Sequence, residues 1–410
     1  MIDPARTSRL SDDTPTVQIT ITGEQRFGAT HSVLDALAPL NVEVIDLEHH
    51  VVRDQLTIVL LVTSTTSPLE DVVKAVAAAA IPFHLRVDYA YGEGDSAMRH
   101  KGRAAVAILG NPLTADAISA VTDVVVAQGG FIDRIRRLSR WPVTTLELSL
   151  SGVEVARLRA ELPSIAARTD TSIAVSQRGL GRRGKHLVVM DVDSTLVRQE
   201  AIDLIARHAG VEDAVAEITA AAMRGELNFE QSLIQRVRLL AGLDASVLDQ
   251  VRHEIKLTAG ARTLIRTLKR AGNQLAVVSG GFLQTVAPLA ESLGIDYCEA
   301  NELEIVDGKL TGNLIGPIIG REGKAAALRR FAAQEGLPSS RTVAIGDGAN
   351  DIDMLRAAGL GIAFNAKPAL QELADTSVNV PYLDSVLYLL GMSREEIEEA
   401  DQSEVNSLRG

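Results

Sequence analysis

The sequence predicts an α/β protein in which a larger C-terminal domain, built on a parallel sheet, follows two small βαββαβ modules. Two observations lead to this prediction. The first half contains an internal repeat, and the second half contains short apolar runs that alternate with helical stretches. The length of 410 residues also suggests two to four domains, because single cores rarely extend beyond about 250–300 residues.

The repeat aligns without a gap, so that Gly23 falls on Gly110 and Ser32 falls on Ser119. Each copy shows the order strand, helix, strand, strand, helix, strand, which is a ferredoxin-like unit. The predicted elements are strands 17–22, 42–47, 56–62 and 83–88 with helices 32–40 and 69–80, and then strands 104–109, 131–135, 143–150 and 171–175 with helices 119–128 and 153–168.

Neither copy contains a set of residues that suggests catalysis. His49 and His50 have no further carboxylate or cysteine at ligand spacing, so we interpret them as surface or structural histidines. The loops 23–30 and 110–116 contain glycines, which let a backbone approach a small ligand. The tandem, over 15–177, resembles the ACT domain family, whose paired modules bind amino acids. The resemblance implies an amino-acid effector, with serine as the first candidate, and a homodimer; a dimerisation platform without ligand is the alternative.

Composition and charge narrow the class of protein. The net charge is -12, and no stripe of basic and aromatic residues is present, so a nucleic-acid partner is not expected. Residues 1–15 lack a secretory signal, and no apolar run reaches membrane-spanning length. Cys298 is the single cysteine, which excludes an internal disulfide. We therefore expect a cytoplasmic protein without a membrane partner.

Three apolar runs of the second half end at polar residues. They lead into Asp191, Ser279 and Asp347, and helical stretches at 261–271 and 324–334 lie between them. In a parallel sheet the carboxyl ends of the strands meet at one edge, and ligands bind there. The sequence therefore predicts one site that gathers these residues.

The residue types at this site favour phosphoryl chemistry. If the strand stays extended, Asp191 and Asp193 share one face, and their repulsion calls for a cation. Carboxylates without His or Cys favour Mg²⁺. Ser279, the N–H of Gly280 and the ammonium of Lys324 would offset phosphoryl oxygens. One carboxylate could attack phosphorus while the other manages the proton.

Four segments, DVDST at 191–195, SGG at 279–281, Lys324 and GDGAND at 346–351, resemble the motifs of the haloacid dehalogenase superfamily of phosphotransferases. Each segment alone could be a helix cap or a turn, whereas all four in order at strand ends are specific. The resemblance implies Asp191 as nucleophile, Asp193 as general acid and base, and Asp191, Asp347 and the backbone carbonyl of Asp193 as metal ligands, with Ser279, Gly280, Lys324 and Asn350 at the phosphoryl group and Asp351 in support.

Residues 198–257 read as a helical insertion that resembles the small cap of this superfamily, with helices over 201–208, 211–223, 229–240 and 245–255. Phe229 and Arg236 are seven residues apart, so they share a helix face. An arginine can form two hydrogen bonds with a carboxylate. Glu200 could pair with an ammonium. With Met223, these residues fall where superfamily members that hydrolyse O-phospho-L-serine bind their substrate.

The resemblance implies Mg²⁺-dependent release of L-serine and phosphate through an aspartyl-phosphate intermediate, as in serine biosynthesis. Another small phosphomonoester or a phosphoprotein is the alternative substrate, and an amino-acid sensor with an inactive phosphatase half is the alternative class. The expected parts are a tail over 1–14, ACT-like domains over 15–92 and 93–177, a linker over 178–185, the phosphatase core over 186–197 and 258–397, the cap over 198–257 and a tail over 398–410.

Overall fold

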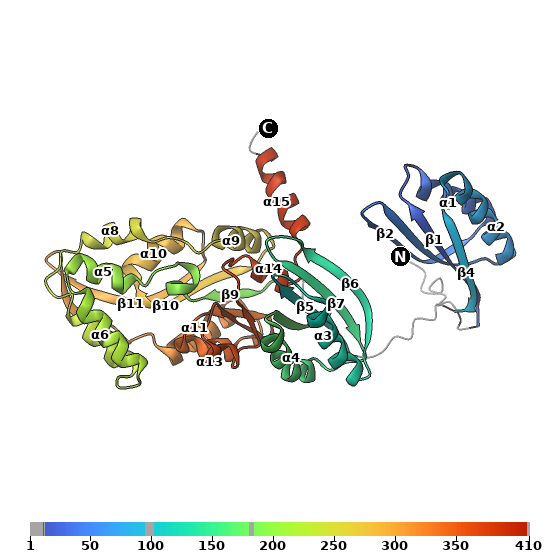
Figure 1. Ribbon diagram of the computed structural model, residues 1–410. Helices are drawn as coiled ribbons and strands as arrows, with labels where there is room; N and C mark the ends of the chain where they lie inside the picture. The colour runs from blue at the N-terminus through green and yellow to red at the C-terminus, as the bar shows by residue number, and fades with distance from the viewer. Residues whose placement is uncertain (1–10, 12, 95–101, 180–183, 408–410) are drawn as a thin grey trace. The chain divides into compact units, whose positions relative to one another are not determined.

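The computed structural model describes residue 11 and residues 13–94, 102–179 and 184–407. The chain divides into two compact units, residues 1–99 and residues 100–410 (Figure 1). Among the described residues, no helix combines the length and the apolar character that crossing a bilayer requires.

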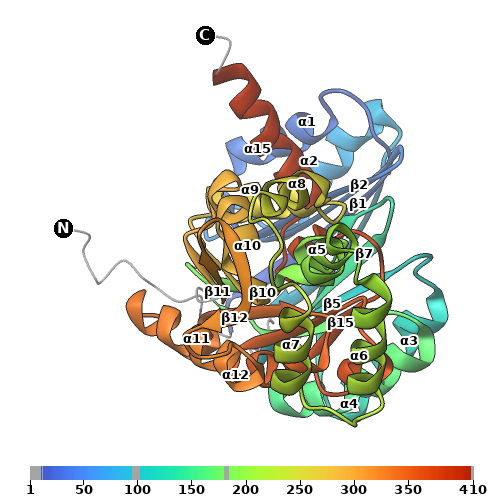
Figure 2. The ribbon, with the colours of Figure 1, turned by 90° about the vertical axis from the view of Figure 1, so that its left-hand side faces the viewer.

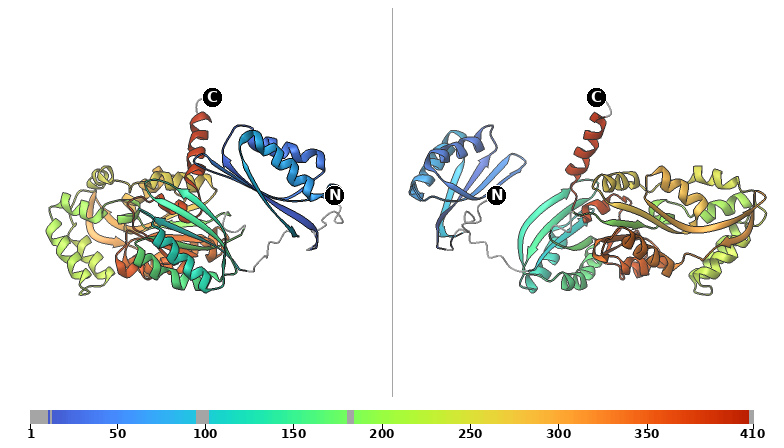
Figure 3. Two further views of the ribbon diagram at one scale, coloured as in Figure 1. Left: turned by 45° about the vertical axis from the view of Figure 1, so that its right-hand side comes forward. Right: turned by 180° about the vertical axis from the view of Figure 1, so that it is seen from behind.

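The first unit is one four-stranded antiparallel sheet in the order β2-β3-β1-β4, with both helices on the same face (Figure 3). Alternate side chains of β1, namely Val17, Ile19 and Ile21, are fully buried beneath the helices, as the period of two in a strand requires. The strands are β1 (Pro15–Glu24), β2 (Glu43–Val52), β3 (Gln55–Thr63) and β4 (Arg86–Glu93), and the helices are α1 (Ala29–Leu37) and α2 (Leu69–Ala80).

The second unit begins with a sheet of the same plan, in the order β6-β7-β5-β8. The repeated βαββαβ order expected from the sequence is therefore confirmed in both copies. The strands are β5 (Arg103–Gly110), β6 (Phe131–Ser139), β7 (Thr144–Ser151) and β8 (Ser172–Gln177), and the helices are α3 (Ala115–Ala127) and α4 (Val155–Thr169).

A seven-stranded sheet forms the core of the rest of this unit, in the order β12-β11-β10-β9-β13-β14-β15. All neighbours are parallel except β11 and β12, which form an antiparallel hairpin that the sequence reading did not include. The strands are β9 (Leu187–Met190), β10 (Gln274–Phe282), β11 (Tyr297–Val306), β12 (Lys309–Ile315), β13 (Thr342–Gly346), β14 (Leu360–Phe364) and β15 (Thr376–Val378).

Helices cover both faces of this sheet, which explains why β9 is apolar at every position. Val188 and Met190 pack into the core under α9, α10 and α14, whereas Leu187 and Val189 pack into the core under α11, α12 and α13. The helices are α9 (Ala261–Arg270), α10 (Leu283–Ser292), α11 (Arg321–Gln334), α12 (Ile352–Ala357), α13 (Pro368–Gln371) and α14 (Ser385–Leu389).

Four helices form the insertion between β9 and β10, and Figure 2 shows them grouped together. They share an apolar core in which Ile205, Val237 and Val251 are buried. The helices are α5 (Ala201–Ala209), α6 (Glu212–Met223), α7 (Phe229–Arg238) and α8 (Val247–Glu254).

The C-terminal end of the chain differs from the expected tail. Helix α15 (Arg394–Ser407) continues through residues 398–407 and projects outward in both views of Figure 3. Asp401 forms ion pairs with Arg266 and Arg270 of α9, and Ile397 is buried in the core. These contacts across more than 100 residues stabilise a polar helix that the local sequence did not distinguish from a tail.

The second ACT-like sheet packs directly on the larger domain. Leu138 and Val143 belong to the same apolar cluster as Leu387 of α14. Arg136 donates to the carbonyl of Gly391 at 3.2 Å, and Arg159 donates to the carbonyl of Gly359 at 3.2 Å. The two parts therefore share a core.

This shared core predicts a measurable loss of stability in Leu138→Ala. Leu138 is fully buried, so its truncation should lower the free energy of unfolding by about 2–5 kcal/mol in urea titrations. Val126→Ala is the control, because Val126 is 68% exposed in the same ACT-like domain and should change the free energy by less than about 0.5 kcal/mol. Equal stability of the two variants would contradict the packing.

Candidate active site

Three neighbouring strands bring the predicted site together. Met190, at the end of β9, is paired with Val277 of β10 on one side and with Ile345 of β13 on the other. Asp191 follows β9 immediately, and Ser279 lies two residues beyond Val277. The polar residues at these strand ends are therefore adjacent, as the sequence reading expected.

Lys324 lies at the centre of the cluster. Its side chain on α11 is fully buried, and Nζ lies 2.8 Å from Oδ1 of Asp191 and 2.7 Å from Oδ1 of Asp351. Burial alone would lower the pKa of this lysine, but the two carboxylates outweigh burial and raise the pKa above its usual value. The lysine is thus a fixed positive charge beside Asp191.

One carboxylate oxygen of Asp191 makes two contacts that orient the side chain. Its Oδ1 accepts a hydrogen bond from the N–H of Val192 at 2.7 Å as well as the contact with Lys324. Burial and the neighbouring Asp351 raise its pKa well above the usual range, and Lys324 opposes this shift. The carboxylate is therefore buried and oriented, and it is repelled by its acidic neighbour.

Asp193 does not share a strand face with Asp191, contrary to the extended geometry considered from the sequence. The strand ends at Met190, so both aspartates lie beyond it, and the chain turns after Asp193 at Ser194, which adopts a left-handed φ of 58°. Asp193 instead accepts hydrogen bonds from the N–H of Ala201 at 2.9 Å and from the hydroxyl of Ser279 at 3.0 Å. Its side chain thus caps α5 and faces the site at the same time.

Asp191, Asp347 and Asp351 form a cluster that could hold a metal ion. Each offers a carboxylate oxygen, and these oxygens lie within 4.8 Å of one another. Thr195 donates to Oδ1 of Asp347 at 2.8 Å, while burial raises the pKa of Asp347 to about 6. An all-oxygen donor set of this kind fits Mg²⁺. Asp351 was expected only as a support, but its carboxylate also lies in this cluster.

The SGG segment is shaped by close approaches that exclude side chains. A Cβ on Gly281 would lie 2.6 Å from Oδ2 of Asp193, and the N–H of Gly281 donates to the hydroxyl of Ser279 at 2.8 Å. A Cβ on Gly280 would lie 2.8 Å from the ring of Phe229. Asn301 donates to the carbonyl of Gly280 at 2.9 Å, which fixes the loop. The glycines therefore let the cap and Asp193 come close to Ser279.

Phe229 brings the cap to the strand ends. It occupies the first position of α7, where Asn228 and Gln231 form a reciprocal capping box. Its ring lies over Gly280 and also approaches Gly320, where a Cβ would be 3.3 Å away. The helix start thus sets the position of the aromatic ring above the site.

Glu200 and Arg236 face the same region. Glu200 accepts a hydrogen bond from the hydroxyl of Ser194 at 3.1 Å. Glu200 is exposed to solvent, yet desolvation by the surrounding protein and the charge of Asp193 raise its pKa to about 7. Arg236 interacts electrostatically with Glu200 and Asp203, and burial lowers its pKa. A carboxylate and a guanidinium are therefore held near Asp193.

Two predicted residues contribute less to this picture. Asn350 folds back so that its side-chain oxygen covers Gly348, next to Asp347 in the chain. The side chain of Met223 lies outside the part of the chain that the structure describes. The other predicted site residues are brought together.

The sequence reading missed Thr195, Asn301 and Asp203. Thr195 was visible in DVDST, and its bond to Asp347 depends on a contact across 152 residues. Asn301 is buried on β11, but three glutamates lie on the same strand, so its polar side chain gives no distinct signal in the sequence. Asp203 lies on α5 near Arg236, where only the packing of the cap reveals it.

Comparisons with known proteins agree with this arrangement. Residues 188–356 match the haloacid dehalogenase-like hydrolase family, and residues 15–90 and 103–176 each match an ACT domain. A phosphoserine phosphatase of Streptomyces coelicolor is 55% identical, over 95% of this chain and 96% of its own length. One from Mycobacterium tuberculosis is 49% identical, over 94% of this chain and 95% of its own length.

A solved structure extends the similarity to the fold. The unliganded crystal structure of a probable phosphoserine phosphatase from Vibrio cholerae aligns with a TM-score of 0.55 at 33% identity, and it covers 73% of this chain and 88% of that one. Sequence identity, domain order and fold thus agree on the same family. The chain belongs to the phosphoserine phosphatase family, enzymes with a haloacid dehalogenase-like hydrolase domain that here follows two ACT domains.

Proposed function

We propose that the protein hydrolyses O-phospho-L-serine to L-serine and phosphate through a phosphorylated Asp191. The observation that carries this proposal is that Glu200 and Arg236 both lie near Asp193, which is next to the buried pair of Asp191 and Lys324. Asp191, Asp193 and Lys324 are residue types that carry out phosphoryl transfer. Glu200 can bind the ammonium of an amino acid, and Arg236 can bind its carboxylate.

In the first step, a carboxylate oxygen of Asp191 attacks phosphorus and forms an acyl phosphate. The bond from phosphorus to the serine oxygen breaks, and that oxygen takes a proton from Asp193. Burial raises the pKa of Asp193, which favours the protonated form that this step needs. Its hydrogen bonds to Ala201 and Ser279 hold the carboxyl in place.

In the second step, water attacks the acyl phosphate while Asp193 takes one of its protons. Phosphate leaves, and the carboxylate of Asp191 is restored with Asp193 again protonated. Lys324, the hydroxyl of Ser279 and the N–H of Gly280 offset the negative charge of the phosphoryl oxygens in both steps. Asn350 supports this group from the GDGAND loop.

Asp191, Asp347 and the backbone carbonyl of Asp193 would hold a Mg²⁺ ion, with Asp351 keeping Lys324 in position. When bound, the ion supplies positive charge beside the phosphoryl oxygens. The formal charges support this assignment. Three carboxylates and one ammonium sum to −3 + 1 = −2, which a divalent cation neutralises.

The cap selects the substrate in this proposal. Arg236 binds the serine carboxylate, Glu200 binds the ammonium, and Phe229 and Met223 enclose the remainder. The domain boundaries expected from the sequence are retained for this purpose, with the cap over 198–257. The ACT domains would bind an amino acid, with serine as the first candidate, and would pair in a cytoplasmic homodimer.

The direct test measures phosphate release from phosphoserine, phosphothreonine and a sugar phosphate, with Mg²⁺ and with a chelator. Phosphoserine should be preferred, and release should stop without Mg²⁺. Arg236→Ala should raise KM for phosphoserine by about tenfold to a hundredfold, because a charged hydrogen bond contributes about 1.5–3 kcal/mol. Arg238→Ala, which changes an exposed arginine on the same helix, is the matched control. Faster turnover of another ester would contradict the assignment of the substrate.

Glu200 should make substrate binding depend on pH. Its pKa of about 7 means that protonation removes its negative charge as the pH falls from 8 to 6. KM for phosphoserine should therefore rise about tenfold over this range, because the ionised fraction falls from about 0.9 to about 0.1. Glu200→Gln should bind weakly at both pH values and show only the titration of the substrate phosphate. Parallel pH profiles of the two proteins would exclude this role of Glu200.

A further inference from the structure

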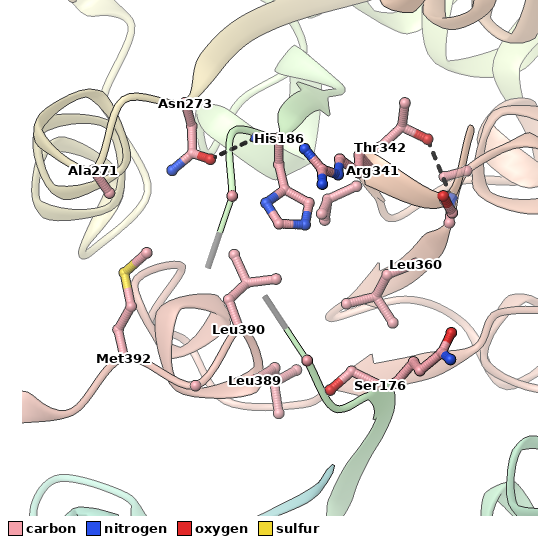
Figure 4. Close-up of a pocket in the computed structure, with 18 of the residues that line it drawn as sticks. Ser176, His186, Ala271, Asn273, Arg341, Thr342, Leu360, Leu389, Leu390 and Met392 are labelled. Atoms are coloured by element: carbon pink, nitrogen blue, oxygen red, sulfur yellow. Dashed lines mark hydrogen bonds between the residues drawn. The ribbon is translucent and has the colours of Figure 1, made fainter. Parts of the chain in front are cut away.

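A cavity of about 900 Å³ lies away from the catalytic carboxylates, between the second ACT domain and the phosphatase domain. Arg159 of α4 and Ser176 of β8 line it from the ACT domain, and His186, Arg341 and Thr342 line it from the phosphatase domain. Figure 4 shows the ring of His186 beside the guanidinium of Arg341, with Leu390 across from them. Both domains therefore build this cavity.

The lining carries an excess of positive charge. Two of its arginines are neutralised by aspartates, Arg178 by Asp133 and Arg270 by Asp401. Arg341 has no side-chain partner among the residues that the structure describes, and Arg159 donates to backbone carbonyls only. Among the described lining residues the ionisable side chains, histidine apart, are Arg159, Arg178, Arg270, Arg341 and Glu396.

Two hydroxyls and an imidazole add neutral hydrogen-bonding groups. Oγ1 of Thr267 and Oγ of Ser176 are buried without a hydrogen-bond partner in the described chain, and Thr267 is only 7% exposed. Buried hydroxyls without a partner are costly, and a bound polar ligand would satisfy them. Burial lowers the pKa of His186, and Arg341 adds to that shift, so the ring is neutral at pH 7.

Part of the remaining wall is apolar. Leu360, Leu389, Leu390 and Met392 line it, and Figure 4 shows the last three on the side opposite Arg341. A ligand that fits both parts needs an anionic group at one end and an apolar body at the other. Inorganic phosphate alone would leave the apolar wall uncovered.

We infer that this cavity binds a small organic anion, with a carboxylate or phosphate-like group at Arg341 and an apolar body against the leucines. A ligand at this position would contact the starts of two strands that lead to the catalytic residues. His186 directly precedes β9, and Thr342 begins β13, whose opposite ends lead into Asp191 and Asp347. The inference does not depend on which phosphate ester the enzyme hydrolyses.

Calorimetric titration of the full chain with phenylacetate and phenylphosphonate tests the inference and separates the two kinds of anion. At least one should bind with a dissociation constant in the millimolar range or below, and neutral phenylacetamide should bind at least about tenfold more weakly. Arg341→Gln should weaken the anion about tenfold or more, and the isosteric Thr267→Val about threefold. Arg262→Gln, on the exposed side of α9, should change nothing.

The location is checked with Arg236→Gln, which alters the cap and leaves this cavity intact. Binding that survives Arg236→Gln and is lost in Arg341→Gln supports the inference. Binding lost in Arg236→Gln and kept in Arg341→Gln would place the anion at the catalytic site and overturn it. Absence of heat with both anions up to about 10 mM would overturn it as well.

Discussion

The contact between the buried ammonium of Lys324 and the carboxylates of Asp191 and Asp351 is the constraint on which the rest of the site depends. A fully buried lysine is stable only when paired, so α11 and the end of β9 must meet at this point. The same contact leaves the cluster negatively charged, which creates the need for a cation. The ion pairs of Lys324 thus stabilise the fold at this point and also set the charge of the site.

The order of the strands brings the polar residues of the site together. Placing β9 between β10 and β13 brings Asp191 beside Ser279 and Asp347 at one edge of the sheet. Glycine at 280 then leaves space for Phe229, so the cap reaches the strand ends without a clash. In the proposed function, Glu200 and Arg236 of the cap direct the phosphoryl chemistry of the superfamily to an amino-acid ester.

Short-range patterns predicted most of this architecture. The alternation in β1 and the continuous apolar run of β9 follow from how many faces of each strand are buried. Three of the four motifs were located because each lies at the end of a predicted strand, and the fourth, Lys324, lies on α11. The relation of Asp193 to Asp191 could not be predicted, because β9 ends at Met190 and no side chain in the DVDST segment marks that end. The β11–β12 hairpin was missed although it is local: Asp307 and Gly308, both with positive φ, form the tight turn between its strands and are a typical hairpin signal. Helix α15 was missed because contacts distant in the sequence stabilise it, such as those of Asp401 with two arginines.

Phosphorylation of Asp191 is the step on which the proposed reaction depends, and rapid quenching followed by peptide mass spectrometry detects it. The protein is mixed with phosphoserine and Mg²⁺, quenched in acid within milliseconds and digested. We expect a phosphoryl group on the peptide that contains Asp191, and we expect none in Asp191→Asn or in samples without Mg²⁺. Phosphate release at full rate by Asp191→Asn, or a phosphoryl group on another residue, would contradict it.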